Sequence, residues 1–305
     1  MVVKIMKNDS FIIYGDHPVI AGMVHRTTEF EPEILNIIPG YLKKRLGKKT
    51  EGSGNTAGEE TGNAVNDVKR IVIFEDECGR VDIGAMLMYL QLNDSARGIV
   101  FVRDDMRPLG DFTDEGECGT FSDRVFRFNV RFGEKFISDL ITLAFFDQTA
   151  EPDLAAAEAA YLRIVRQLSE AYMNMASERC RKLNKGIRYF TEAISAVADD
   201  TERINSVTKD LYRAIGRGNG VSGSCVERSM RHSLEQIWNQ LGGILGKMVL
   251  EHSSEYESMR PTNSEFILFS AKYLRKCCPA VFAAGKLIRD MRNAADGALS
   301  GDSDD

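Results

Sequence analysis

This 305-residue chain lacks several patterns that mark whole classes of protein. No apolar run approaches the ~20 residues that a helix needs to cross a bilayer, so we expect no transmembrane segment. The six cysteines include no Cys-x-x-Cys pair, and the four histidines stand apart from any cysteine or carboxylate pair at metal spacing. The first residues turn polar too soon for a signal peptide. The sequence therefore predicts an intracellular protein with reduced thiols and no metal.

An excess of basic residues is also missing. Lysine and arginine number 39 against 45 aspartates and glutamates, which gives a formal charge of −6. A protein that lies wholly on phosphate backbones is usually basic overall. Any contact with nucleic acid must therefore be a local patch.

No catalytic pattern is visible either. Gly218–Gly223 spells the dinucleotide-binding fingerprint, but a helical pattern precedes it where the fingerprint needs a strand, so a linker is the better interpretation. The acidic pairs are neighbours in sequence, which point apart on a strand, and no Ser-His-Asp order occurs. We therefore expect a protein that is not an enzyme and needs no cofactor.

The front half of the chain carries strand signals. Short apolar runs occur at Phe11–Tyr14, Arg70–Phe74 and Gly98–Val102, and Val125–Phe132 alternates apolar and polar residues. Ile137–Phe146 is either one more strand or the entry into the helices. These signals predict an α+β fold whose N-terminal domain is antiparallel and β-rich, like a sandwich or a barrel.

After Pro152 the apolar spacing becomes helical. One heptad seam comprises Ile187, Phe190, Ile194, Val197, Thr201, Ile204, Thr208, Leu211 and Ile215, and a second comprises Met230, Leu234, Ile237, Leu241, Ile244 and Met248. Ser224–Glu227 and Thr262–Glu265 have the pattern of capping boxes. The pattern predicts a bundle of long helices, whose seams pair either within one chain or between chains.

These signals divide the chain into five parts. We expect an N-terminal segment with short strands (1–46), a flexible loop (47–68), a β-rich core (69–150), a helical bundle or coiled-coil region (151–296) and a disordered acidic tail (297–305).

Two basic clusters are candidates for nucleic-acid binding. The first is Lys43, Lys44 and Arg45; the second is Arg179, Arg181, Lys182, Lys185 and Arg188. Tyr189 and Phe190 follow the second cluster, and cations beside aromatic rings can hold single strands through phosphate charge and stacking. The alternative is that these residues form a solvent-exposed junction between two helices and bind no nucleic acid.

The order of features from Ile71 to Phe132 resembles the core of the thirty-kilodalton family of plant-virus cell-to-cell movement proteins. An apolar strand, a Gly-containing apolar run and a further strand are followed by an Asp-x-Arg element, a glycine step and an alternating aromatic strand. The family-motif residues are Asp105, Arg107 and Gly119.

The resemblance implies a viral movement protein that binds single-stranded nucleic acid or nucleoprotein. Such a protein self-associates through its helices and carries its cargo through plasmodesmata, so it is found there and in the host cytoplasm. The alternative is an intracellular, non-enzymatic adaptor or complex subunit with a helical scaffold half and a protein partner.

Overall fold

The computed structural model describes ten stretches of the chain: residues 11–14, 33–35, 70–74, 97–102, 124–129, 132–148, 152–177, 185–199, 210–249 and 260–300. They belong to two compact units. Unit 1 takes in Met1–Tyr161 and Pro279–Asp305, and unit 2 takes in Leu162–Cys278. The boundary thus falls within one helix, α6 (Leu154–Ser177).

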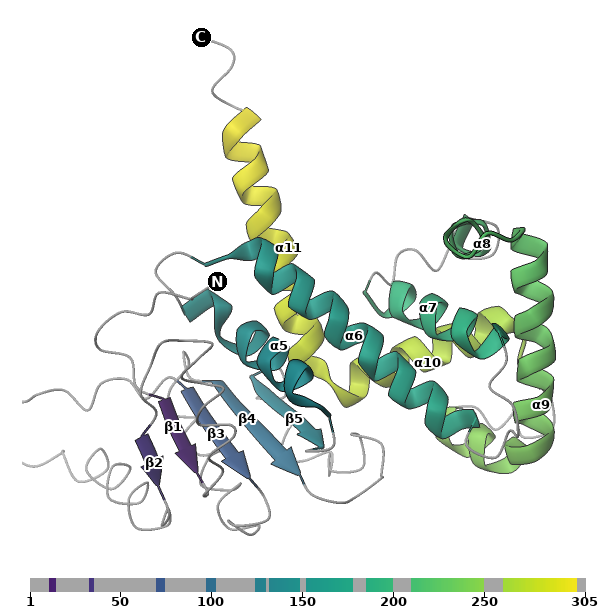
Figure 1. Ribbon diagram of the computed structural model, residues 1–305, viewed down its shortest axis with the longest axis horizontal. Helices are drawn as coiled ribbons and strands as arrows, with labels where there is room; N and C mark the ends of the chain where they lie inside the picture. The colour runs from purple at the N-terminus through teal and green to yellow at the C-terminus, as the bar shows by residue number, and fades with distance from the viewer. Residues whose placement is uncertain are drawn as a thin grey trace, which may run out of the picture. The chain divides into compact units, whose positions relative to one another are not determined.

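The strands of unit 1 form one parallel sheet in the order β2-β1-β3-β4-β5. They are β1 (Phe11–Tyr14), β2 (Glu33–Leu35), β3 (Arg70–Phe74), β4 (Arg97–Val102) and β5 (Val125–Asn129) (Figure 1). Every pairing is parallel; Val72, for example, lies opposite Ile13 and Ile99. This order is the one found in flavodoxin-like doubly wound folds.

The prediction of an antiparallel, β-rich N-terminal domain is therefore wrong. The described strands are short and all parallel, and most of the described residues are helical. Parallel strands need a crossover of a dozen or more residues, and every connection between paired strands is longer than that. The alternation in Val125–Phe132 does not indicate an antiparallel sheet, because β5 is an edge strand of the parallel sheet. The segment at Ile137–Phe146 is helical, since α5 (Glu134–Phe145) begins well before Pro152.

The core of unit 1 joins segments that are far apart in sequence. Helix α5 packs on β4, and α11 (Pro279–Ser300) packs on α5 and β5. The 3-10 turn η1 (Phe146–Gln148) follows α5, and its Asp147 carboxylate accepts from the Arg97 guanidinium at 2.7 Å. Gly285 of α11 lies against the Tyr161 ring, where a Cβ would clash. Phe282 meets the same ring edge-on, with 6.4 Å between the ring centroids.

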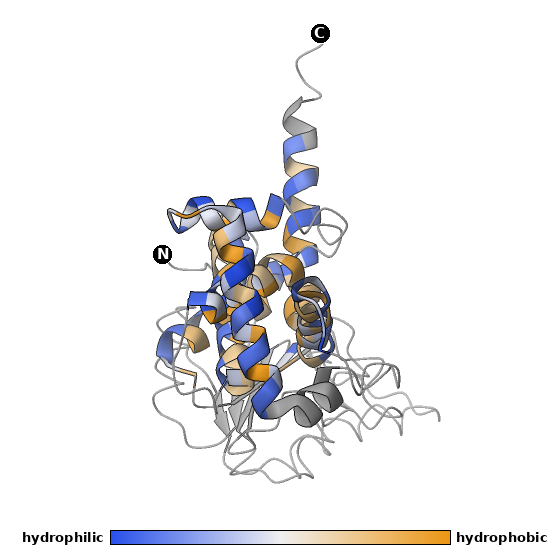
Figure 2. Cartoon of the chain, turned by 90° about the vertical axis from the view of Figure 1, so that its right-hand side faces the viewer, coloured by the Kyte–Doolittle hydropathy of each residue, from blue (hydrophilic) through white to orange (hydrophobic). Residues whose placement is uncertain are grey.

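Unit 2 is built from helices that carry a buried stripe. They are the remainder of α6, α7 (Lys185–Asp199), α8 (Tyr212–Gly218), α9 (Gly223–Val249) and α10 (Asn263–Cys277). Helix α7 packs against both α9 and α10, and its seam residues are buried: Ile187, Phe190, Ile194 and Val197. Figure 2 shows apolar and polar residues on different sides of the same helices. The described part of this seam therefore pairs within the chain.

No helix in the described part of the chain combines the length and apolarity that a membrane span requires.

A buried tyrosine in unit 2 makes stability depend on alkaline pH. Burial raises the pKa of the Tyr172 phenol above its ordinary 10.0, against the opposing effect of the Ser270 hydroxyl, which donates to the Tyr172 oxygen at 3.2 Å. The neutral phenol is thus favoured in the folded state, so its stabilisation is complete below pH 10 and is lost as the pH rises above it. We expect the free energy of unfolding to fall by about 1.4 kcal/mol at pH 11 from this group alone.

Urea titrations at pH 8 and pH 11 measure this fall. Tyr172→Phe removes the titrating group, so the variant should lose less stability over the same interval. An equal fall in both proteins would contradict the assignment.

The beginning of α10 confirms the capping box predicted at Thr262–Glu265. The Thr262 side chain accepts from the Glu265 backbone N–H at 3.3 Å, and the Glu265 carboxylate accepts from the Thr262 backbone N–H at 2.7 Å. The helix ends at Cys277, and Pro279 begins α11, because proline is accepted in the first turn of a helix.

Thr262→Ala removes this cap and should lower the free energy of unfolding by about 1 kcal/mol. Glu265→Gln is the matched control, because glutamine also closes a capping box and should leave stability nearly unchanged. Urea unfolding at neutral pH measures both. A loss in Glu265→Gln together with no loss in Thr262→Ala would show that charge, and not the cap, matters here.

Candidate nucleic-acid interface

Two helices of unit 2 are joined by a tight turn. Helix α8 ends at Gly218 and α9 begins at Gly223, with Asn219–Ser222 between them. The Val221 N–H donates to the Gly216 carbonyl at 2.9 Å, and the Gly220 N–H donates to the Arg217 carbonyl at 3.4 Å. These two bonds form a Schellman motif, the common end of a helix that stops at a left-handed residue.

Glycine is required at two positions of this turn. Gly220 has φ +67°, the left-handed region that favours glycine. Gly216 is buried, and a Cβ there would lie 2.6 Å from the Val221 carbonyl oxygen. The conformation of this turn therefore depends on the absence of a side chain at Gly216 and Gly220.

The beginning of α9 is capped by Ser222. The Cys225 N–H donates to the Ser222 Oγ at 3.3 Å, and the Val226 N–H donates to the Ser222 carbonyl at 3.1 Å. The capping box predicted at Ser224–Glu227 is therefore wrong, because the helix begins before Ser224. The carboxylate of Glu227 instead forms an ion pair with Arg231.

The inner face of α9 packs against α7 and keeps α8 and α9 in place. Val226, Met230, Leu234 and Ile237 are buried. Gly186 lets α7 approach α9 closely, since a Cβ there would clash with the Ser229 backbone and the Ser233 hydroxyl. The Asn219 amide donates to the Glu192 carboxylate of α7 at 2.9 Å, which ties the turn to the same helix.

The outer face of α9 is polar and exposed over its first four turns. It carries Ser224, Cys225, Arg228, Arg231, His232, Glu235 and Gln236. The His232 ring and the Gln236 amide lie within hydrogen-bond distance of each other, at 3.2 Å. Among the described residues, Arg228 has no ion-pair partner. Helix α8 adds two exposed cations, Arg213 and Arg217.

Two helices joined by a short glycine-containing turn form a helix-turn-helix. In DNA-binding proteins built this way, the second helix enters the major groove and its N-terminal residues reach base edges, while the first helix crosses the sugar-phosphate backbone. Arginine is the side chain best suited to the paired acceptors of guanine. The exposed Arg228 lies in the first turns of α9, where such contacts are made.

Most of the residues predicted as binding sites lie outside the described residues. They are Lys43, Lys44, Arg45, Arg179, Arg181 and Lys182, together with the family-motif residues Asp105, Arg107 and Gly119. Lys185 and Arg188 are described and exposed in the first turns of α7. Arg188 pairs with Glu192 at 3.2 Å. Their role in binding stays a prediction.

Sequence reasoning missed the outer face of α9. It took Gly218–Gly223 for a linker and assigned the helix after it only a buried seam. Part of the signal was present in the same residues, because a glycine followed by a capping serine between two amphipathic segments is typical of a tight turn between two helices.

No group of three or more metal-ligating side chains occurs within the described stretches.

One known protein family matches the part of the chain that contains α8 and α9. The family model described as "Sporulation initiation factor Spo0A C terminal" matches residues 180–274. This range is under half of the chain, and it contains α7, α8, α9 and most of α10. The helix-turn-helix therefore lies inside the matched range.

The match corrects the resemblance to plant-virus movement proteins. The matched family is a bacterial sporulation factor, and the strands assigned to the viral core pair in parallel. Transport through plasmodesmata and a viral origin are therefore wrong. The resemblance rested on loose strand-like runs, which any buried sheet produces.

Proposed function

We propose that this protein binds double-stranded DNA in a sequence-dependent way and regulates transcription, with α9 as the recognition helix. The C-terminal domain of Spo0A is a helical DNA-binding domain of a bacterial response regulator, and it is not a catalytic domain. The observation that carries the proposal is the α8–turn–α9 geometry within the matched range. It agrees with the non-enzymatic alternative drawn from the sequence.

The side chains divide into two roles. Arg228 and His232 face outward near the start of α9 and read base edges in the major groove. Arg213 and Arg217 of α8 contact phosphates, which positions the helix but carries no sequence information. Arg213 lies 3.7 Å from Asp210, and both side chains are well exposed, so this ion pair yields readily to a phosphate.

Double-stranded DNA replaces the single-stranded cargo expected from the sequence. The major groove of B-DNA is about 12 Å wide, the width that admits one helix. A single strand offers no such groove and is held instead by stacked aromatic rings. Tyr189 and Phe190, the rings nearest the second basic cluster, are buried in unit 2 and cannot stack on bases. A protein with this function acts where the genome lies, in the bacterial cytoplasm.

Selection of duplexes from a random library tests the proposal. The full chain should enrich one duplex motif, and the affinity should fall steeply with salt because phosphate contacts release counterions. A single strand of the same sequence should compete poorly. Enrichment of no motif, or equal competition by single strands, would overturn the proposal.

A further inference from the structure

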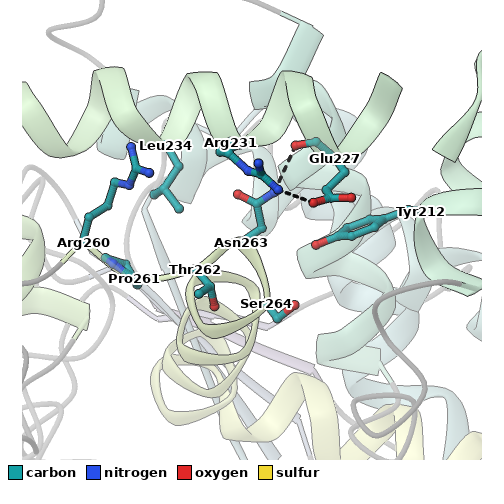
Figure 3. Close-up of a pocket in the computed structure, with 9 residues that line it drawn as sticks. All are labelled: Tyr212, Glu227, Arg231, Leu234, Arg260, Pro261, Thr262, Asn263 and Ser264. Carbon is teal, nitrogen blue, oxygen red and sulfur yellow. Dashed lines mark hydrogen bonds and ion pairs between the residues drawn. The ribbon is translucent and has the colours of Figure 1, made fainter. Parts of the chain in front are cut away.

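Unit 2 contains a pocket that DNA recognition does not use. It has a volume of about 500 Å³ and lies between α8, α9 and the beginning of α10. The residues that matter to its chemistry are Tyr212, Glu227, Arg231, Arg260, Asn263 and Ser264 (Figure 3). The volume is within the range of sites that hold small molecules.

One residue that lines this pocket has an unsatisfied polar atom. Asn263 is only 8% exposed, and its side-chain Nδ2 donates to the Glu227 carbonyl at 3.1 Å. This bond fixes which way the amide points, because only the nitrogen can donate. The Oδ1 atom is then buried and accepts no hydrogen bond from any described residue. Figure 3 shows it turned away from Tyr212, toward the side of Leu234.

Buried polar atoms in folded proteins almost always have a partner. An acceptor left open in a pocket of this size calls for a hydroxyl or an amine from outside the chain. The Oδ1 atom of Asn263 therefore points to a ligand that donates a hydrogen bond.

The charges around the pocket favour an anion. The carboxylate of Glu227 is neutralised by Arg231. Arg260 is 37% exposed and lies 3.5 Å from the exposed Glu235 carboxylate, a loose pair that an anion can replace. The N-terminus of α10 begins at Asn263, so the positive end of its dipole also lies at the pocket, where the Glu265 carboxylate of the capping box shares it.

The pocket lies to one side of the proposed DNA contacts. Glu227, Arg231 and Leu234 lie at i, i+4 and i+7 on α9 and form one stripe along the helix. Arg228 is rotated from Glu227 by about 100° on a helix of 3.6 residues per turn. A helix that presents Arg228 to the groove therefore turns the Glu227 side of the pocket away from the groove floor.

We propose that this pocket binds a small phosphate monoester on a hydroxylated carbon skeleton. The phosphate lies against Arg260 and the beginning of α10, and a ligand hydroxyl donates to the Asn263 Oδ1. The site is separate from the proposed DNA-binding function and does not depend on it.

Calorimetric titration of the full chain with ribose 5-phosphate tests the proposal. Methyl phosphate lacks the hydroxyls and ribose lacks the phosphate, so both should bind at least tenfold more weakly. Arg260→Gln should weaken ribose 5-phosphate at least tenfold, and Lys272→Gln, an exposed cation on α10, should not. Heat unfolding of each variant verifies that the fold is kept.

Two results would overturn the proposal: no heat with ribose 5-phosphate, or equal affinity for ribose 5-phosphate and ribose. A third concerns the source of the phosphate. If Arg260→Gln weakens duplex binding while ribose 5-phosphate does not bind, the pocket holds the DNA backbone, and the small-molecule site is refuted. Arg228→Ala separates the two functions, because it should lower duplex affinity and leave ribose 5-phosphate affinity unchanged.

Discussion

Replacing Arg228 by alanine should lower the affinity of the chain for its selected duplex by about 5- to 150-fold, because one good bidentate contact to guanine contributes about 1–3 kcal/mol of discrimination. The side chain is exposed and has no ion-pair partner among the described residues. Its loss should therefore leave the free energy of unfolding within about 0.5 kcal/mol of the parent. Fluorescence anisotropy with a labelled duplex measures the affinity, and urea unfolding measures the stability.

Lys272→Ala is the matched control for this experiment. Lys272 is an exposed cation of α10, in the same unit, but it lies on neither helix of the helix-turn-helix. The control should keep most of the duplex affinity and most of the salt dependence. A comparable loss in both variants would mean that net charge drives binding, and that α9 does not read the sequence.

Gly216→Ala should disrupt the turn between α8 and α9. The added Cβ would lie 2.6 Å from the Val221 carbonyl oxygen, which is a backbone atom that cannot rotate away. The turn must then shift, and the bond from the Val221 N–H to the Gly216 carbonyl is strained. Overpacking of this kind costs about 1–3 kcal/mol of stability. We also expect duplex affinity to fall more than tenfold, because α9 loses its orientation against α8.

Gly218→Ala is the control for this clash, two residues further along the same helix. A Cβ at Gly218 meets nothing within 4 Å. Alanine in a helix is favoured over glycine by about 0.5–1 kcal/mol, so this variant should be as stable as the parent or more so. Urea unfolding of the pair gives opposite signs if the close approach at Gly216 is real. Similar stability changes in the two variants would contradict it.

The sequence identified the strands better than it identified the sheet. The runs at Phe11–Tyr14 and Arg70–Phe74 are strands with the predicted bounds. The antiparallel direction predicted for these strands was wrong, because an apolar run is equally compatible with parallel and antiparallel partners. Only pairing over long connections sets the direction, and an alternating edge strand such as β5 resembles an antiparallel one when taken alone.

The helical half was more predictable because its signals are local. The capping box at Thr262 depends on atoms three residues apart, and the seam of α7 depends on spacing along a single helix. The site was less predictable. Arg228 stands out by nothing in the sequence, and the role proposed for it depends on the orientation that the turn at Gly220 gives to α9.

By itself, the sequence determined where several of the strands and helices form and where α10 begins and ends, and it predicted that any nucleic-acid contact would be a local patch. Those properties depend on short-range spacing and on net charge. Only the tertiary structure decided the direction of the strands, the pairing of α8 with α9 and the open acceptor at Asn263. Each of these arises where segments distant in sequence, or faces of different helices, are brought together by the burial of their apolar sides.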